Sequence, residues 1–316
     1  MLTPPVSRGT YPWVAAAAFS GDGTTVAIAS ALCTDFVTND QRWGTGVWRV
    51  ATRAPVLRLP AASGYRVALD RTGSILAVED RTWRTATGEQ LRGLGGAYAF
   101  ADDDRRALVA RRGRIRIVGV PSGAVLATLD EPSPKAEDTS PFAAAFSHDG
   151  ERLVTKRNGT VRLWDAESGR RVADLGKAAT SAAFGAGGRL VLVVYERRLA
   201  SYRASDGSPV VSVARTGRQN AAAISPDGKL AAEARDDGSL DLVELQTGDA
   251  VRLQTETSES LTTVSFLPGR EALVVGDRTG AAHLVRCPVC ADDDVLLARA
   301  RARAERLSRL VARRPA

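Results

Sequence analysis

Residues 143–175 read AAAFSHDGERLVTKRNGTVRLWDAESGRRVADL and predict four short strands joined by three tight turns. The first turn is SHDG at residues 147–150, and the second is Asn158-Gly159, the dipeptide most typical of a two-residue hairpin. The third turn, at residues 165–169, separates an alternating strand that ends in Leu-Trp from a last strand at residues 171–175. This stretch predicts a small antiparallel sheet, which cannot bury its own faces without neighbours.

The same pattern recurs along the chain. Six positions match that of Trp164, each next to a polar turn and at intervals of 35 to 46 residues: Trp48, Trp83, Val118, Tyr202, Val243 and Val285. The turn after the first strand repeats in step, as SGDG at 20–23, DRTG at 70–73, ADDD at 101–104, GAGG at 185–188 and SPDG at 225–228. Two markers that repeat together indicate seven copies of the unit.

Tandem four-stranded units with a Trp-Asp pair, here Trp164-Asp165, resemble the WD40 repeats of β-propellers. The resemblance implies an all-β, seven-bladed WD40-like β-propeller in which each blade is a four-stranded antiparallel sheet. The other copies lack the Trp-Asp pair, and none opens with Gly-His, so the chain resembles a diverged member. Its buried Asp–His–Ser/Thr–Trp hydrogen-bond network is expected to be mostly missing, with apolar packing holding the blades. The excess of Arg over Lys and the abundant Ala suggest a bacterial source.

The ends of the chain differ from the repeats. Residues 11–290 are expected to form the propeller, with outer strands at 54–59, 89–94, 125–129, 171–175, 209–213 and 250–253. The seventh copy shows no outer strand, so residues 1–10 are predicted to supply it and close the blade. Residues 291–316 are predicted to form an Arg-rich C-terminal α-helix, because three acidic residues precede a basic remainder.

The net charge of +7 is concentrated in this last segment. Residues 295–316 hold seven arginines and one glutamate, which leaves the rest of the chain almost neutral. The body is therefore not expected to be a basic platform, and a nucleic-acid partner is predicted only through the C-terminal helix, if at all. The sequence shows no signal peptide and no apolar run that would span a bilayer, and three cysteines do not make a secreted disulfide framework. A cytoplasmic protein without membrane contact is expected.

Residue types that carry chemistry are few. Cys287 and Cys290 have metal-ligand spacing with His283 just upstream, but zinc needs a fourth ligand that no second cysteine or histidine pair supplies. A structural turn is the favoured interpretation, and metal and redox roles remain alternatives. The second histidine, His148, falls at a turn and is expected to be exposed and unimportant. The acids at 102–104 and 236–237 also fall at hairpin turns, so solvated turn residues are favoured over metal ligands. No GxSxG and no phosphate-binding loop occur, so neither a catalytic residue nor a cofactor is predicted.

Two segments lengthen the repeat. Residues 32–42 (LCTDFVTNDQR) fall between the second and third strands of the first copy, and residues 130–141 (DEPSPKAEDTSP) join the third copy to the fourth. By resemblance both lie on the top face of the propeller, where WD40 proteins usually take their partners, and long loops on a rigid scaffold commonly carry function. The candidate partner-binding residues are Asp35, Phe36, Asn39, Asp40, Arg42, Lys135, Glu137 and Asp138.

These observations favour a non-catalytic protein–protein interaction scaffold. By family analogy it would serve as a subunit of a bacterial signalling or defence assembly. The alternative is a small-molecule-binding or hydrolytic propeller that uses its central channel. Such a site needs acidic, Asn or His side chains on several inner strands, and the predicted inner strands are rich in Ala instead.

Overall fold

The structure, a computed structural model, describes residues 11–33, 41–59, 66–111, 114–132, 142–215, 219–225, 227–266, 272–279 and 281–287. The chain divides into two compact units, Met1–Gln219 (unit 1) and Asn220–Ala316 (unit 2). The segments 1–10 and 291–316 of the sequence prediction lie outside the described residues. Within the described ranges, no helix has the length and apolar character that a bilayer span requires.

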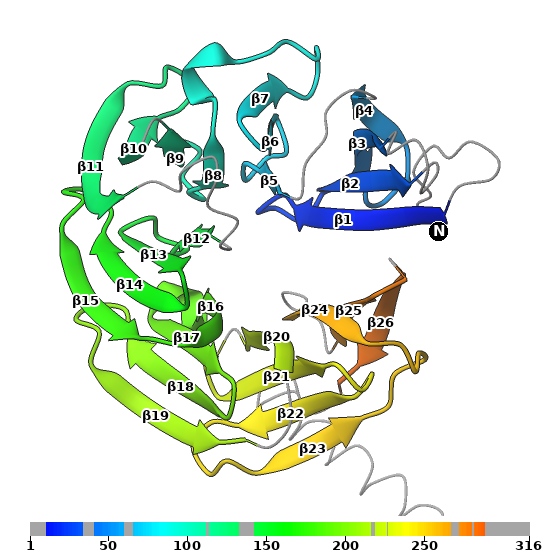
Figure 1. The fold of residues 1–316 in the computed structure, drawn as a ribbon, viewed down its shortest axis with the longest axis vertical. Coiled ribbons are helices and arrows are strands. Elements are labelled where there is room, and N and C mark those ends of the chain that lie inside the picture. The colour runs from blue at the N-terminus through cyan, green and yellow to red at the C-terminus, as the bar shows by residue number, and fades with distance from the viewer. Residues whose placement is uncertain are drawn as a thin grey trace, which may run out of the picture. The chain divides into compact units, whose positions relative to one another are not determined.

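Unit 1 contains five antiparallel sheets whose strands follow one another in chain order, with the first strand of each innermost (Figure 1). The first two sheets comprise β1 (Tyr11–Phe19), β2 (Thr25–Cys33), β3 (Gln41–Arg49) and β4 (Pro55–Leu59), then β5 (Val67–Leu69), β6 (Ile75–Val78) and β7 (Arg81–Arg84). The third comprises β8 (Ala97–Phe100), β9 (Arg106–Arg111), β10 (Arg114–Gly119) and β11 (Val125–Pro132). The last two comprise β12 (Phe142–Phe146), β13 (Arg152–Arg157), β14 (Thr160–Asp165) and β15 (Arg171–Gly176), then β16 (Ala179–Gly185), β17 (Leu190–Tyr195), β18 (Arg198–Arg203) and β19 (Pro209–Ala214).

Unit 2 contains two more sheets of the same kind. They comprise β20 (Gln219–Ile224), β21 (Leu230–Arg235), β22 (Leu240–Glu244) and β23 (Ala250–Leu253), then β24 (Leu261–Phe266), β25 (Ala272–Asp277) and β26 (Ala282–Arg286). Together the described strands make five four-stranded and two three-stranded sheets. The predicted seven copies are therefore confirmed, and the described part of the seventh has three strands.

The second sheet departs from the prediction, because no outer strand forms at residues 89–94. One bridge joins Gln90 to Trp83, and the chain then turns into a 3-10 helix, η1 (Arg92–Leu94). The Gly-rich sequence around Leu94 permits this turn, which places Leu94 fully inside the core. Its carbonyl accepts a hydrogen bond from Thr82 Oγ1 at 2.7 Å, so the segment still covers β7.

The repeated first turn has one hydrogen-bond pattern. In the turn at residues 147–150, Ser147 Oγ donates to Asp149 Oδ1 at 2.5 Å and accepts from the Arg152 N–H at 2.9 Å, while Gly150 has φ +71°. Only glycine adopts this conformation without strain. The same two bonds recur in the first and sixth sheets, on Ser20 and Ser225. The sequence repeat SxDG thus encodes a self-contained turn. The glycines at 185–188 also form a turn, with η2 (Ala186–Gly188) leading into strand β17 rather than a helix.

Apolar side chains from neighbouring sheets share common clusters. Leu108, Ile115 and Ile117 of the third sheet pack with Leu153 and Trp164 of the fourth, and all five are fully buried. A second cluster joins the fourth sheet to the fifth, others join the first and second and the second and third, and one joins the two sheets of unit 2. Burial of each large side chain contributes about 1.5–3 kcal/mol, so the contacts between sheets dominate stability.

A polar network crosses the cluster around Trp164. The Trp164 Nε1–H donates to Thr155 Oγ1 at 2.9 Å, and the Thr155 hydroxyl donates to Glu131 Oε2 at 2.7 Å. The other Glu131 oxygen accepts from Arg162 Nη1 at 2.5 Å, and the carboxylate is almost completely buried. Glu131 was predicted to belong to the loop at 130–141, but β11 continues to Pro132 and carries it into the core. Apolar packing alone therefore does not hold this sheet.

The first extension is also partly strand. The register of β2 and β3 continues without a break from Thr25 opposite Arg49 to Cys33 opposite Gln41. The connection that remains, residues 34–40, is shorter than the predicted 32–42, because backbone pairing satisfies the groups of the flanking residues.

We predict that Thr155→Val lowers the free energy of unfolding by about 1–3 kcal/mol, because it removes the partner of two buried polar groups, Trp164 Nε1–H and the Glu131 carboxylate. Urea denaturation followed by tryptophan fluorescence measures this loss. Thr160→Val in the same sheet is the matched control, and a double-mutant cycle with Trp164→Phe isolates the indole contact. Equal effects of the two valine substitutions would show that the network contributes nothing.

Candidate interaction surface

Each sheet has two chemically different ends. Its strands are antiparallel and adjacent in chain order, so the turns between the first and second and between the third and fourth strands lie together. We call this the lower end. The upper end carries the connection between the second and third strands and the link to the next sheet.

Hydrogen bonds join the lower ends of the first four sheets of unit 1. The Asp22 N–H donates to the Arg71 carbonyl at 2.9 Å, and the Arg71 N–H donates to Asp104 Oδ1 at 2.9 Å. The His148 ring then contacts Asp102 Oδ2 at 2.7 Å, which joins the fourth sheet to the third. His148 is exposed, as predicted, and its ring contacts an acid of the preceding sheet.

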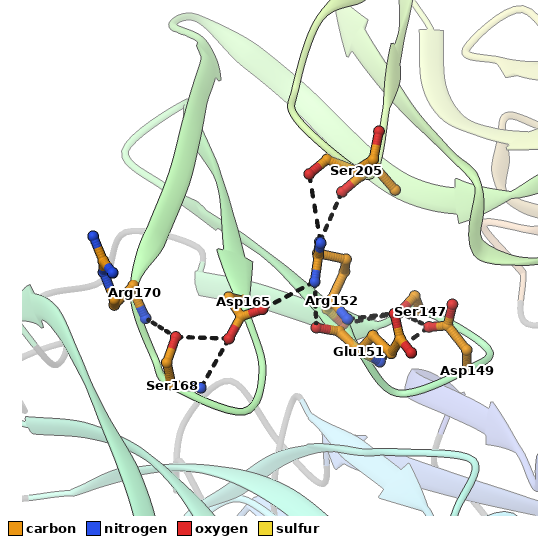
Figure 2. Close-up of polar contacts among 9 residues, drawn as sticks. Ser147, Asp149, Glu151, Arg152, Asp165, Ser168, Arg170 and Ser205 are labelled. Atoms are coloured by element: carbon orange, nitrogen blue, oxygen red, sulfur yellow. Dashed lines mark hydrogen bonds and ion pairs between the residues drawn. The ribbon is translucent and has the colours of Figure 1, made fainter.

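The fifth sheet is tied in by Arg152 (Figure 2). Its guanidinium donates to Asp165 Oδ2 at 3.0 Å within its own sheet, and reaches the carbonyls of Ala204 at 3.0 Å and Ser205 at 3.5 Å on the next. Asp165 also accepts from the Ser168 hydroxyl at 2.6 Å, which fixes the turn below it. The role of Arg152 could not be predicted from the sequence, because nothing in the fourth repeat shows that this side chain bonds to carbonyls of the fifth.

Burial and these contacts shift the pKa of carboxyl groups at the lower end. Burial and the nearby carboxylates of Asp70 and Asp102 raise the pKa of Asp104, despite the hydrogen bond from Arg71. Burial would also raise the pKa of Asp149, but hydrogen bonds from Ser147 Oγ and the Glu151 N–H lower it below its ordinary value. The lower-end groups named above thus already have partners within the chain.

The connections that break the repeat length both leave from upper ends. Residues 34–40 connect β2 to β3, and residues 133–141 connect β11 to β12. Of the predicted partner-binding residues, Arg42 lies on β3 with its Cα opposite that of Leu32. The others lie outside the described residues and stay predictions: Asp35, Phe36, Asn39, Asp40, Lys135, Glu137 and Asp138.

Solved structures share the fold of this chain. The chain is similar to the C-terminal WD40 domain of Sif2, with a TM-score of 0.66 and 16% identity over 90% of this chain and 84% of that one. It is also similar to the β-propeller domain of Cps50 (Swd1) from Myceliophteria thermophila, with a TM-score of 0.62 and 16% identity over 90% of this chain and 99% of that one. The chain has the seven-bladed WD40 β-propeller fold. No family model matches the sequence, and no curated protein matches it at a significant level, so the likeness concerns the fold alone.

The candidate metal ligands lie in the seventh blade. Cys287 is fully buried and forms a disulfide, so its sulfur offers no thiolate to a metal ion in this state. His283 Nε2 contacts Asp277 Oδ2 at 2.8 Å, and Cys290 lies outside the described residues. Within the described ranges, no group of three or more His, Cys, Asp or Glu side chains could hold a metal ion.

Asp277 is the centre of the polar contacts in this blade. It accepts hydrogen bonds from the Thr279 hydroxyl at 2.6 Å, from the backbone N–H groups of Thr279 and Ala281, and from Thr257 Oγ1 at 3.2 Å. Burial alone would raise its pKa, but these bonds and the one with His283 lower it to about 2. The carboxylate orders the turn after β25 and orients His283. No serine or cysteine contact of the described residues completes a nucleophilic triad.

The sixth blade contains a buried charge cluster that the sequence analysis also missed. Arg235 Nη1 lies 3.0 Å from Asp241 Oδ2 and 3.7 Å from Glu233 Oε2, and Arg252 Nε donates to Asp241 Oδ1 at 2.9 Å. The side chains of Arg235, Asp241 and Glu233 are almost completely buried. Glu233 and Asp241 are Cα partners on β21 and β22, so the cluster crosslinks these strands and is structural.

We predict that Asp277→Asn destabilises the fold by about 2 kcal/mol near neutral pH, since a folded pKa near 2 replaces an ordinary one of 3.8. This stability is present above pH 4 and is lost as the pH falls through 2. In urea denaturation, the difference between wild type and variant should shrink toward zero at pH 2. Asp249→Asn, at an exposed turn, controls for the loss of one charge, and a difference that stays constant with pH would contradict the assignment.

We predict further that the denatured, unreduced protein has one titratable thiol, because the chain has three cysteines and Cys287 is bonded to another. Titration with a thiol reagent, with and without reductant, measures this number. A zinc site at Cys287 would instead give three thiols after chelation without any reductant, with zinc released in equal amount to protein.

Proposed function

We propose that the protein is a non-catalytic interaction scaffold whose partner protein binds at the upper ends of the blades of unit 1. WD40 propellers typically bind protein partners. The observation that carries the proposal is the difference between the two ends of these blades. Lower-end turns are tied to one another by Asp22, Arg71, His148 and Arg152, whereas the connections that exceed the repeat length leave from the upper ends.

The proposal extends to the parts of the chain that the structure does not describe. Residues 1–10 would complete the seventh blade, and residues 291–316 would form an Arg-rich helix that docks on the propeller or on a partner. The protein would act in the cytoplasm as a subunit of a bacterial signalling or defence assembly. The disulfide at Cys287 argues against a cytoplasmic location, because a reducing compartment would keep that cysteine as a thiol.

The competing function is a small molecule held or hydrolysed in the central channel. Among the described inner strands, polar side chains are sparse, and Asn220 on β20 already donates to the Leu261 carbonyl at 2.8 Å and to Ser260 Oγ at 3.2 Å. No observation favours this second function.

We predict that a near-stoichiometric protein partner copurifies from the native host and is lost when the two upper-end connections are shortened. The variant replaces residues 34–40 and 133–141 with Gly-Ser turns. It keeps Cys33, Gln41 and Asp130 to Pro132 because these belong to strands, and removal of Glu131 would leave Thr155 and Arg162 of the fourth blade without this partner. Mass spectrometry and a matched melting curve measure partner and fold.

Arg170→Ala with Arg203→Ala, two exposed lower-end positions, is the control and should retain the partner. A partner that survives the loss of both connections, or a preparation with no protein but one small molecule per chain, would overturn the proposal.

A further inference from the structure

Basic side chains gather at the upper ends of three consecutive blades of unit 1. We call them the basic surface, defined as Arg111, Arg114, Lys156, Arg157, Lys177 and Arg197. Each comes from the connection between the second and third strands or, for Lys177, from the link that follows β15. The Cα atoms of Arg111 and Arg114 pair across the end of β9 and β10, and Arg197 lies in the turn between β17 and β18.

Backbone contacts bring these positions together at the upper ends. The Ala179 N–H donates to the Gly159 carbonyl at 2.9 Å, so the link that carries Lys177 lies against the turn that follows Lys156 and Arg157. Lys156 Nζ also reaches across to the Thr180 carbonyl at 2.8 Å on the next blade, and burial lowers its pKa. The cations are therefore spread over neighbouring blades of one unit.

Four of these cations have no acidic partner among the described residues. Arg111, Arg114, Lys177 and Arg197 are exposed and form no ion pair there. The exposed acids nearby in the chain are Asp130, Glu196 and Asp174, and Asp174 pairs with Arg162 and Arg171 instead.

At the lower ends of the same blades three cations do pair with acids: Arg106 with Asp103 at 2.8 Å, His148 with Asp102, and Arg152 with Asp165. The exposed arginines 105, 170, 189 and 203 also lie there, in or beside turns that carry several acids. Within the described residues of these three blades, cations therefore outnumber acids at the upper ends, and this excess favours a positive potential there.

We propose that the basic surface binds an extended segment of the partner protein rich in Asp and Glu. This inference rests on the proposed scaffold function and adds the chemistry of the partner. Groups of cations on successive blades match carboxylates spaced along an extended chain, and exposed guanidinium and ammonium groups without internal partners are free to bind them.

The same surface is poorly suited to nucleic acid. Binding of single strands relies on open aromatic rings for base stacking, and two described rings near these upper ends, Tyr98 and Tyr195, each have a guanidinium over one face. The Arg66 guanidinium lies 3.6 Å from the centre of the Tyr98 ring, and that of Arg198 lies 3.8 Å from the centre of the Tyr195 ring. The acids at 102–104 on the lower end would repel a long polyanion, but not a short acidic segment.

The test measures fluorescence anisotropy of a fluorescein-labelled (Glu-Ser)6 peptide with the full-length chain. The variant is Arg111→Gln, Arg114→Gln, Lys177→Gln and Arg197→Gln. The control removes four exposed arginines from the lower ends of the same three blades: Arg105→Gln, Arg170→Gln, Arg189→Gln and Arg203→Gln. Both keep residues 291–316, so any binding by that segment is equal. The upper variant should bind at least about tenfold more weakly, and the control within about twofold of wild type.

Equal binding by the two variants would overturn the proposal. A second measurement uses a labelled twelve-nucleotide oligothymidylate. If the upper variant loses more affinity for this oligonucleotide than for the peptide, the surface binds nucleic acid and the proposal is overturned. Copurification with the same variants separates the two proposals. A partner that needs the long connections but not the basic surface overturns this inference and leaves the scaffold function, whereas peptide binding without any partner protein overturns the scaffold function itself.

Discussion

Every sheet of this chain must bury two apolar faces, and neither can be buried within the sheet. Trp164 and Leu153 of the fourth blade are fully buried only because Leu108, Ile115 and Ile117 of the third cover them. This lateral dependence makes the blades one cooperative core within each unit. It also sets the rule for polar groups that enter the core: Glu131 is tolerated because Thr155 and Arg162 satisfy it, and Asp277 because Thr279, His283 and two backbone N–H groups do.

Because packing between blades stabilises the core, the turns and connections at the two ends of the blades are under different constraints. Lower-end turns are short, three of them share one hydrogen-bond pattern, and they contact the next blade through side chains such as Arg152. Upper ends vary in length and composition, since the chain there needs only to connect strands. A scaffold with one end fixed and the other variable can change its binding specificity without loss of core contacts.

The sequence predicted what local chemistry decides. Asn158-Gly159 and the SxDG turns determine their own hairpins, so the number of sheets and most strands were correct. It failed where the deciding partner is far along the chain. Leu94 turned inward because a neighbouring sheet offered it a core, and Glu131 was assigned to a loop because Thr155 and Arg162 lie more than twenty residues later. The basic surface was not predicted, because the near-zero net charge of the chain before residue 295 does not show where the cations and the acids lie in the fold. The predicted partner-binding residues, apart from Arg42, lie outside the described residues and remain predictions.

The order of the strands has a consequence for biosynthesis. Each described sheet is a meander of consecutive strands, so all of its ladder hydrogen bonds can form from one contiguous stretch of nascent chain. The links between blades come later, because the carbonyls that Arg152 requires, on Ala204 and Ser205, are 52 and 53 residues further on. During translation the fourth blade must therefore wait with an incompletely bonded guanidinium, held only by groups of its own blade such as Asp165, and an open apolar face until the fifth has emerged from the ribosome. A pause in that interval would leave the chain most exposed to aggregation.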